Sequence, residues 1–99
     1  MPRNPRNQLK TPFFHVMIQG LNKSYIFNEA QDIKYYIKIM YELLKEQKII
    51  AYCIMNNHAH ILIKTQNIEN LSSYMHKLNC KYARYYNKKY DRVRLCFSR

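Results

Sequence analysis

The chain has 99 residues and a formal net charge of +11, because 17 Lys and Arg outnumber six Asp and Glu. This length predicts one domain with a modest core. No apolar run approaches the roughly 20 residues that span a bilayer, and the basic start is unlike a secretory signal. We therefore expect a cytoplasmic protein with no membrane segment. The three cysteines are odd in number and form no close pair, which indicates reduced thiols.

The positive charge favours a polyanionic partner, nucleic acid first and an acidic membrane surface as the alternative. Residues 1–12 are basic without periodicity, and we interpret them as an arm. Arg3 and Arg6 in this arm either contact a phosphate backbone or belong to a solubilising tail. The folded domain is expected over 13–92, followed by an irregular tail over 93–99.

The first half of the domain predicts a strand and then a helix. Residues 13–20 alternate, with Phe14, Val16 and Ile18 on one face. Apolar residues at 33, 37, 40 and 44 predict an amphipathic helix over 29–47. Asn28 is the expected N-cap, with Gln31 completing a capping box.

The second half predicts a hairpin and then a helix. Residues 49–55 are apolar on both faces, as in a central strand, and Asn56-Asn57 suits the turn into a strand over 58–65. Helical periodicity returns over 68–90. The order predicts an α+β, ferredoxin-like βαββα fold with an antiparallel sheet that lacks its final strand. Because an open sheet edge invites pairing, we expect a homodimer or a marginally stable monomer.

His58 and His60 are two residues apart on the predicted hairpin strand, so their side chains share one face. Two neighbouring imidazoles make a half-site for a divalent metal. Mg²⁺ or Mn²⁺ there would need oxygen ligands as well, and cleavage of a phosphodiester would need a nucleophile such as tyrosine. By composition alone, a structural pair is the commoner explanation. We assign no catalytic role to the other histidines, His15 and His76.

A basic stripe is predicted on the last helix. Its four residues recur at spacings of four, three and four, and no acid lies between Glu69 and Asp91 to neutralise them. Like charges at this spacing destabilise a helix, so they favour a phosphate partner, with a solvated face as the alternative. The candidate DNA-binding residues are Lys77, Lys81, Arg84 and Lys88, together with Lys23, Arg3 and Arg6.

Residues 55–62, Met-Asn-Asn-His-Ala-His-Ile-Leu, resemble the His-hydrophobic-His (HUH) signature of the single-tyrosine HUH transposases. This insertion-sequence family includes the REP-associated tyrosine transposases. Phe14-His15-Val16, Gly20 and the basic segment 81–90 also resemble it, in the expected order over about 13–92. The resemblance implies cleavage and joining of single-stranded or hairpin DNA through a 5′-phosphotyrosine. It further implies a dimer, and Mg²⁺ or Mn²⁺ at His58 and His60.

The chain departs from this family in two respects. Asn56 replaces a usual proline, and the nucleophilic tyrosine and third metal ligand of the family fall beyond residue 99, as in a truncated copy. We therefore expect DNA binding without transposition by this chain alone. The alternative is a non-catalytic nucleic-acid-binding module, RNA included, without metal. The resident tyrosines that could substitute each match a structural or DNA-contacting position of the family: Tyr82, Tyr85, Tyr86 and Tyr90.

Overall fold

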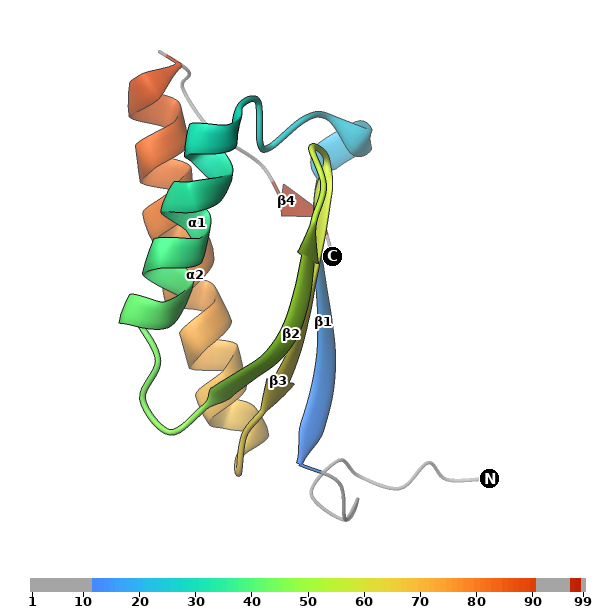
Figure 1. Ribbon diagram of the computed structural model, residues 1–99, viewed down its shortest axis with the longest axis vertical. Helices are drawn as coiled ribbons and strands as arrows, with labels where there is room; N and C mark the ends of the chain where they lie inside the picture. The colour runs from blue at the N-terminus through green and yellow to red at the C-terminus, as the bar shows by residue number, and fades with distance from the viewer. Residues whose placement is uncertain (1–11, 91–96, 99) are drawn as a thin grey trace.

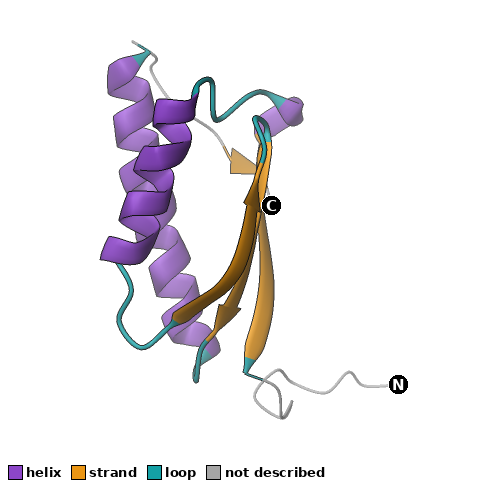
Figure 2. Ribbon diagram, viewed as in Figure 1, coloured by secondary structure: helices purple, strands orange, loops and turns teal. Residues whose placement is uncertain are grey.

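The computed structural model describes residues 12–90 and 97–98, which form one antiparallel sheet with two helices on the same side of it (Figures 1 and 2). The strand order is β2-β3-β1-β4. This is an α+β ferredoxin-like arrangement, as predicted from the order of elements. The elements are β1 (Phe13–Gly20), a 3₁₀ turn η2 (Leu21–Lys23), α1 (Ala30–Glu42), β2 (Lys48–Ile54), β3 (His58–Lys64), α2 (Ile68–Lys89) and β4 (Phe97–Ser98).

The strand register decides which side chains face the helices. β1 pairs with β3 so that Ile18 lies opposite Ala59, and both are buried under the helices. The next pair along, Met17 and His60, points to the other side. No described helix covers that side, which we call the open face. It carries side chains of β1, β3 and β2, namely Phe13, His15, Met17, Gln19, His58, His60, Leu62, Lys64, Lys48, Ala51 and Cys53.

The core between sheet and helices is rich in tyrosine. Tyr36 and Tyr82 are fully buried, and their rings meet edge to face with centroids 5.2 Å apart. A buried hydroxyl is costly unless it is hydrogen-bonded. The hydroxyl of Tyr82 therefore donates to the carbonyl of Ile26, and that of Tyr74 to the carbonyl of Met40.

The first helix is shorter than predicted at both ends. Its N-cap is Glu29, in a capping box with Asp32, and not Asn28 with Gln31. The side-chain amide of Asn28 instead donates to the hydroxyl of Tyr86 at 2.9 Å. The two residues are far apart in the sequence. The helix ends at Glu42 and not at 47. The second helix is close to its predicted range.

The end of the first helix is set by contacts that sequence periodicity does not show. Gln47 is buried and accepts a hydrogen bond from the backbone N–H of Lys45 at 2.9 Å. Its own amide donates to the carbonyl of Asn70 at 3.2 Å. These bonds hold the chain in a loop between α1 and β2.

Two predictions about the strands were wrong. β2 is an edge strand and not a central one, and Ile50 and Tyr52 are 48% and 43% exposed. The final strand is also not wholly missing, because Phe97–Ser98 pairs with Gln19 and Gly20 of β1. Residues 1–11 of the predicted arm, which include Arg3 and Arg6, lie outside the described residues, as does most of the predicted tail.

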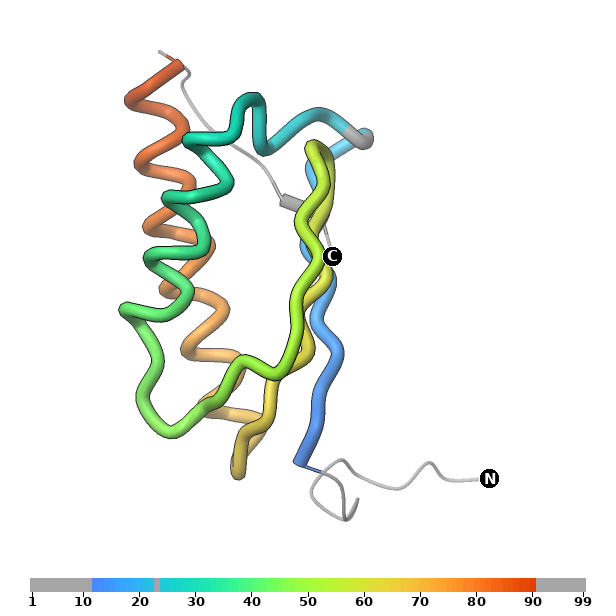
Figure 3. The backbone as a smooth tube through the Cα atoms, in the orientation of Figure 1, coloured from blue at the N-terminus to red at the C-terminus, as the bar shows by residue number. Residues whose placement is uncertain are grey.

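The turn of the β2–β3 hairpin is hydrogen-bonded to the segment that follows β1, and the two lie side by side (Figure 3). The carbonyl of Asn56 accepts the backbone N–H groups of Ile26 at 2.8 Å and Phe27 at 3.0 Å. The carbonyl of Asn57 accepts that of Gly20 at 3.1 Å. The start of β3, where His58 lies, is thereby fixed.

No described helix has both the length and the apolar character that a membrane crossing requires.

Candidate metal and nucleic-acid site

His58 and His60 both lie on the open face of β3, where the alternation of the strand puts them. Their ring centroids are 5.0 Å apart and the ring planes are almost perpendicular, at 89°. Both side chains are partly exposed. Two imidazoles are thus presented together from the central part of a hydrogen-bonded sheet.

Each of these rings has a partner at Nδ1. The Nδ1–H of His58 donates to the side-chain oxygen of Asn57 at 2.7 Å. The Nδ1 of His60 lies 3.0 Å from the Nε2 of His15 on β1. The rings of His15 and His60 are nearly parallel, with centroids 5.0 Å apart and planes within 5° of parallel. Neither of these two contacts uses the Nε2 atom of His58 or His60.

Sequence reasoning gave His15 no role, yet the structure brings it to the pair. The pairing register of β1 with β3 is what places His15 beside this pair. Once the strand at 13–20 pairs antiparallel with the strand at 58–65, the face that carries His15 is also the face of His58 and His60. The register between β1 and β3 could not be read from the sequence, so this contact was missed.

The donor set was tested for the metal that the resemblance implies. Within residues 12–90 and 97–98, no group of three or more His, Cys, Asp or Glu side chains is arranged to hold a metal ion. The two imidazoles therefore fit a half-site, whose remaining ligands would be water and phosphate oxygens. Mn²⁺ suits such a mixed set better than Mg²⁺, which prefers oxygen ligands alone.

The candidate substitute tyrosines lie on the helix side of the sheet. Tyr82 is fully buried, and burial, with the nearby Asp32 charge adding to it, raises its pKa far above the usual value. Burial and the hydrogen bond donated to Asp32 also raise the pKa of Tyr85. The hydroxyl of Tyr86 contacts Asn28 and the carbonyl of Tyr25. Raised pKa values disfavour the phenolate that would attack a phosphate.

The basic stripe of α2 lies in the helix layer, away from the histidines. Lys77, Arg84 and Lys88 are exposed there, and Lys81 pairs with Glu42 of α1 at 3.7 Å. The structure therefore does not bring the stripe together with His58 and His60. The side chain of Lys23 is outside what the structure describes.

The open face has basic residues of its own that sequence reasoning missed. Lys48 of β2 lies opposite Lys64 of β3, so both project from the side that carries the histidines. Lys64 also lies 5.9 Å above the ring centroid of Phe13. Helical spacing predicted the stripe on α2, whereas only strand pairing brings Lys48 and Lys64 together.

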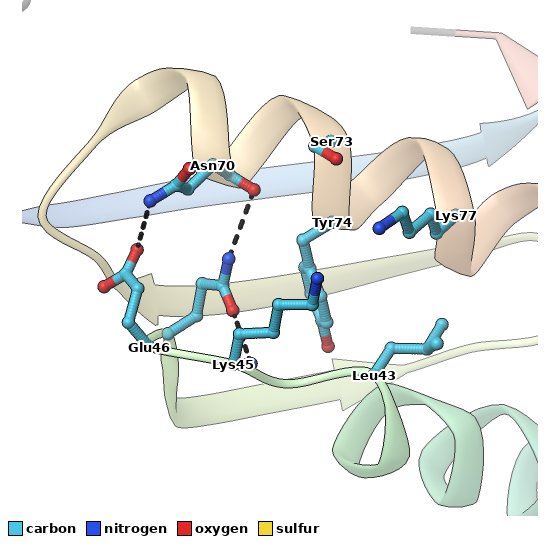
Figure 4. Close-up of a pocket in the computed structure, with 8 residues that line it drawn as sticks. Leu43, Lys45, Glu46, Asn70, Ser73, Tyr74 and Lys77 are labelled. Atoms are coloured by element: carbon cyan, nitrogen blue, oxygen red, sulfur yellow. Dashed lines mark hydrogen bonds between the residues drawn. The ribbon is translucent and has the colours of Figure 1, made fainter.

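A pocket of about 220 Å³ lies between the α1–β2 loop and α2, where Glu46 accepts a hydrogen bond from the amide of Asn70 at 3.3 Å (Figure 4). Lys45 and Lys77 lie at this pocket. It belongs to the helix side of the molecule, so it is separate from the open-face histidines.

Comparison with protein families gives a match that covers most of the chain. A family model described as IS200-like transposase matches residues 9–98. Comparison with curated proteins and with solved structures gives no match.

Proposed function

The chain belongs to the family of IS200-like transposases, and we propose that its domain binds single-stranded or hairpin DNA on the open face of the sheet, with a divalent metal at His58 and His60. One observation carries this proposal. Both imidazoles project from the open face, and the hydrogen-bond contact described at each ring involves Nδ1, which leaves Nε2 for a ligand.

The site suits a metal that is completed by its substrate. His58 and His60 would supply two nitrogen ligands, and a DNA phosphate with water would supply oxygen. When bound, Mg²⁺ or Mn²⁺ provides Lewis-acid stabilisation of charge on a phosphodiester. His58 and His60 would hold the metal ion on a rigid β-strand. A strand positions a site more precisely than a loop does.

The open face also suits an unpaired strand. Lys48 and Lys64 provide positive charge, and the side chains of Phe13 and Met17 are 45% and 42% exposed. Aromatic rings beside cations bind single strands by stacking and phosphate attraction without a sequence code.

Strand cleavage through a 5′-phosphotyrosine requires a tyrosine that reaches the open face. Tyr82, Tyr85 and Tyr86 are engaged on the helix side. We therefore propose that the described domain contributes DNA binding and metal binding. The nucleophile would come from another segment or from a second polypeptide.

A homodimer formed through the edge of β2 is the assembly we propose. Ile50 and Tyr52 at this edge are about half exposed, and an edge strand offers unpaired backbone groups to a second copy. Analytical ultracentrifugation tests this directly. A single species at monomer mass at high concentration would rule the dimer out.

The second candidate function is nucleic-acid binding, RNA included, without metal. The lack of a three-ligand group among the described residues favours it. The two candidates differ in whether binding depends on metal.

The deciding experiment is fluorescence anisotropy with a labelled DNA hairpin, in Mn²⁺ and in EDTA. The wild-type chain is compared with the His58→Ala, His60→Ala double variant and with His76→Ala, which removes an exposed imidazole on α2. Mn²⁺ should tighten binding by the wild type and by His76→Ala, and should not affect the double variant. Equal affinity in EDTA and Mn²⁺ for the wild type would favour the metal-free module. A matched RNA hairpin shows which nucleic acid is preferred.

A further inference from the structure

His15 touches the proposed metal site without belonging to the HUH pair. It comes from β1, one strand away, and places its Nε2 atom 3.0 Å from the Nδ1 of His60. The two rings are also within 5° of parallel, with centroids 5.0 Å apart. This contact restricts both the position and the rotation of the His60 ring.

The two HUH rings are held in the same chemical way. His58 donates from Nδ1 to the side-chain oxygen of Asn57 at 2.7 Å, which places its proton on Nδ1. Only one proton can lie between the Nδ1 of His60 and the Nε2 of His15. If that proton belongs to His60, both HUH rings keep a lone pair on Nε2, where a metal can bind.

We propose that His15 is a positioning residue of the metal half-site, because it accepts the Nδ1–H of His60 and so leaves the Nε2 of that ring as the ligand atom. This inference rests on the proposed metal-binding function. Histidine ligands commonly donate their second N–H to an acceptor, which fixes the tautomer and the ring orientation. Asn57 would have the same role for His58.

The geometry separates this role from that of a third ligand. The Nε2 of His15 is directed at a ring nitrogen and is already engaged there. In agreement, no three-residue metal group is found in the part of the chain that the structure describes. His15 therefore acts through His60.

Three variants distinguish positioning from simple packing. His15→Phe keeps an aromatic ring but has no acceptor. His15→Gln keeps an acceptor without an aromatic ring. His76→Phe is the matched control, because it makes the same change at an exposed histidine on α2. Thermal unfolding followed by circular dichroism verifies that each variant is folded.

The first measurement is the affinity for Mn²⁺ alone, by isothermal titration calorimetry. Loss of an outer partner of a metal ligand weakens affinity about 10- to 100-fold, so we expect that loss for His15→Phe. His15→Gln should recover part of it, and His76→Phe should bind as the wild type does. Wild-type affinity in His15→Phe, or equal loss in the Phe and Gln variants, would overturn the inference.

The second measurement is the tautomer of His60 in the metal-free protein, from long-range ¹H–¹⁵N NMR correlations. The expected result is a proton on Nδ1 in the wild type and a mixture of tautomers in His15→Phe. A proton on Nε2 of His60 in the wild type would overturn the inference.

The two proposals can fail separately. If the His58→Ala, His60→Ala variant binds Mn²⁺ as well as the wild type, the proposed metal site fails and the inference fails with it. If the double variant loses binding while His15→Phe retains it, only the inference fails.

Discussion

Replacing Asp32 by Asn tests how the two helices are held together. This carboxylate is fully buried at the start of α1 and accepts hydrogen bonds from the end of α2. One oxygen accepts from Tyr85 and Lys89, both at 2.7 Å. The other accepts from the hydroxyl of Tyr90 and from the backbone N–H groups of Asn28 and Glu29. Each oxygen therefore serves at least two donors.

The size of the effect follows from this count. Asn replaces one carboxylate oxygen by an NH₂ group, so at least two donors lose their acceptor and face another donor. A hydrogen bond to a charged group contributes somewhat more than the net 1 kcal/mol of a neutral one. We therefore expect Asp32→Asn to lower the free energy of unfolding by about 2–4 kcal/mol. In a domain of this size, the melting temperature should fall by at least about 8 °C.

Urea unfolding followed by circular dichroism measures the change. Glu42→Gln is the control, because it makes the same acid-to-amide change in an exposed pair with Lys81. That change should cost at most about 1 kcal/mol. If Asp32→Asn is as stable as the control, the carboxylate does not hold the helices together. Tyr85 and Tyr90 at the end of α2 would then be less constrained by their hydrogen bonds to Asp32 than the structure indicates.

Three further predictions concern the effect of acid, a close backbone contact and the proposed DNA-binding face. Burial raises the pKa of Asp32, but hydrogen bonds from Lys89, Tyr90 and Tyr85 outweigh it, so the pKa lies below its usual value. The stabilisation that the Asp32 carboxylate gives to the fold is therefore complete above an unfolded-state pKa of about 3.9 and is lost as pH falls further. In urea titrations, the free energy of unfolding should fall less between pH 5 and pH 3 for Asp32→Asn than for the wild type. A Cβ on Gly20 would lie 2.1 Å from the carbonyl oxygen of Ser24. Gly20→Ala should therefore destabilise the domain by about 1–3 kcal/mol in the same assay. Wild-type stability of this variant would contradict the close packing. Removing two phosphate contacts should reduce the slope of log affinity against log salt concentration for single-strand binding by about 1.4. We expect this reduction for the double variant Lys48→Gln, Lys64→Gln and not for the double variant Arg84→Gln, Lys88→Gln. The reverse result would place DNA on the helix layer.

The fold was predictable because local pattern and topology agree in most of this chain. Helical periodicity over 68–90 corresponds to α2 at Ile68–Lys89, and the alternation at 13–20 corresponds to β1. Strand order was less accessible. Apolar residues on both sides of β2 suggested a central strand, but it lies at the edge. An edge strand that exposes Ile50 and Tyr52 has the same sequence pattern as a buried one.

Parts of the site depend on contacts between residues far apart in sequence. The shared face of His58 and His60 needs only the alternation of one strand. The contact of His15 with His60 depends on which strand pairs with β1 and in which register. The end of α1 likewise depends on Gln47 bonding to Asn70 of α2. Such positions are fixed by tertiary contacts, which override local propensity.

The sheet divides the polar chemistry of this domain between its two sides. On the helix side, the hydroxyls of Tyr82, Tyr85 and Tyr90 are bonded to a carbonyl or to Asp32 and help to fix the fold. On the open side, the imidazoles of His58 and His60 are oriented at Nδ1. Exposing a tyrosine of the helix side would break the contacts that hold the helices. If the open face binds DNA as we propose, a nucleophile that acts there would have to come from outside this core.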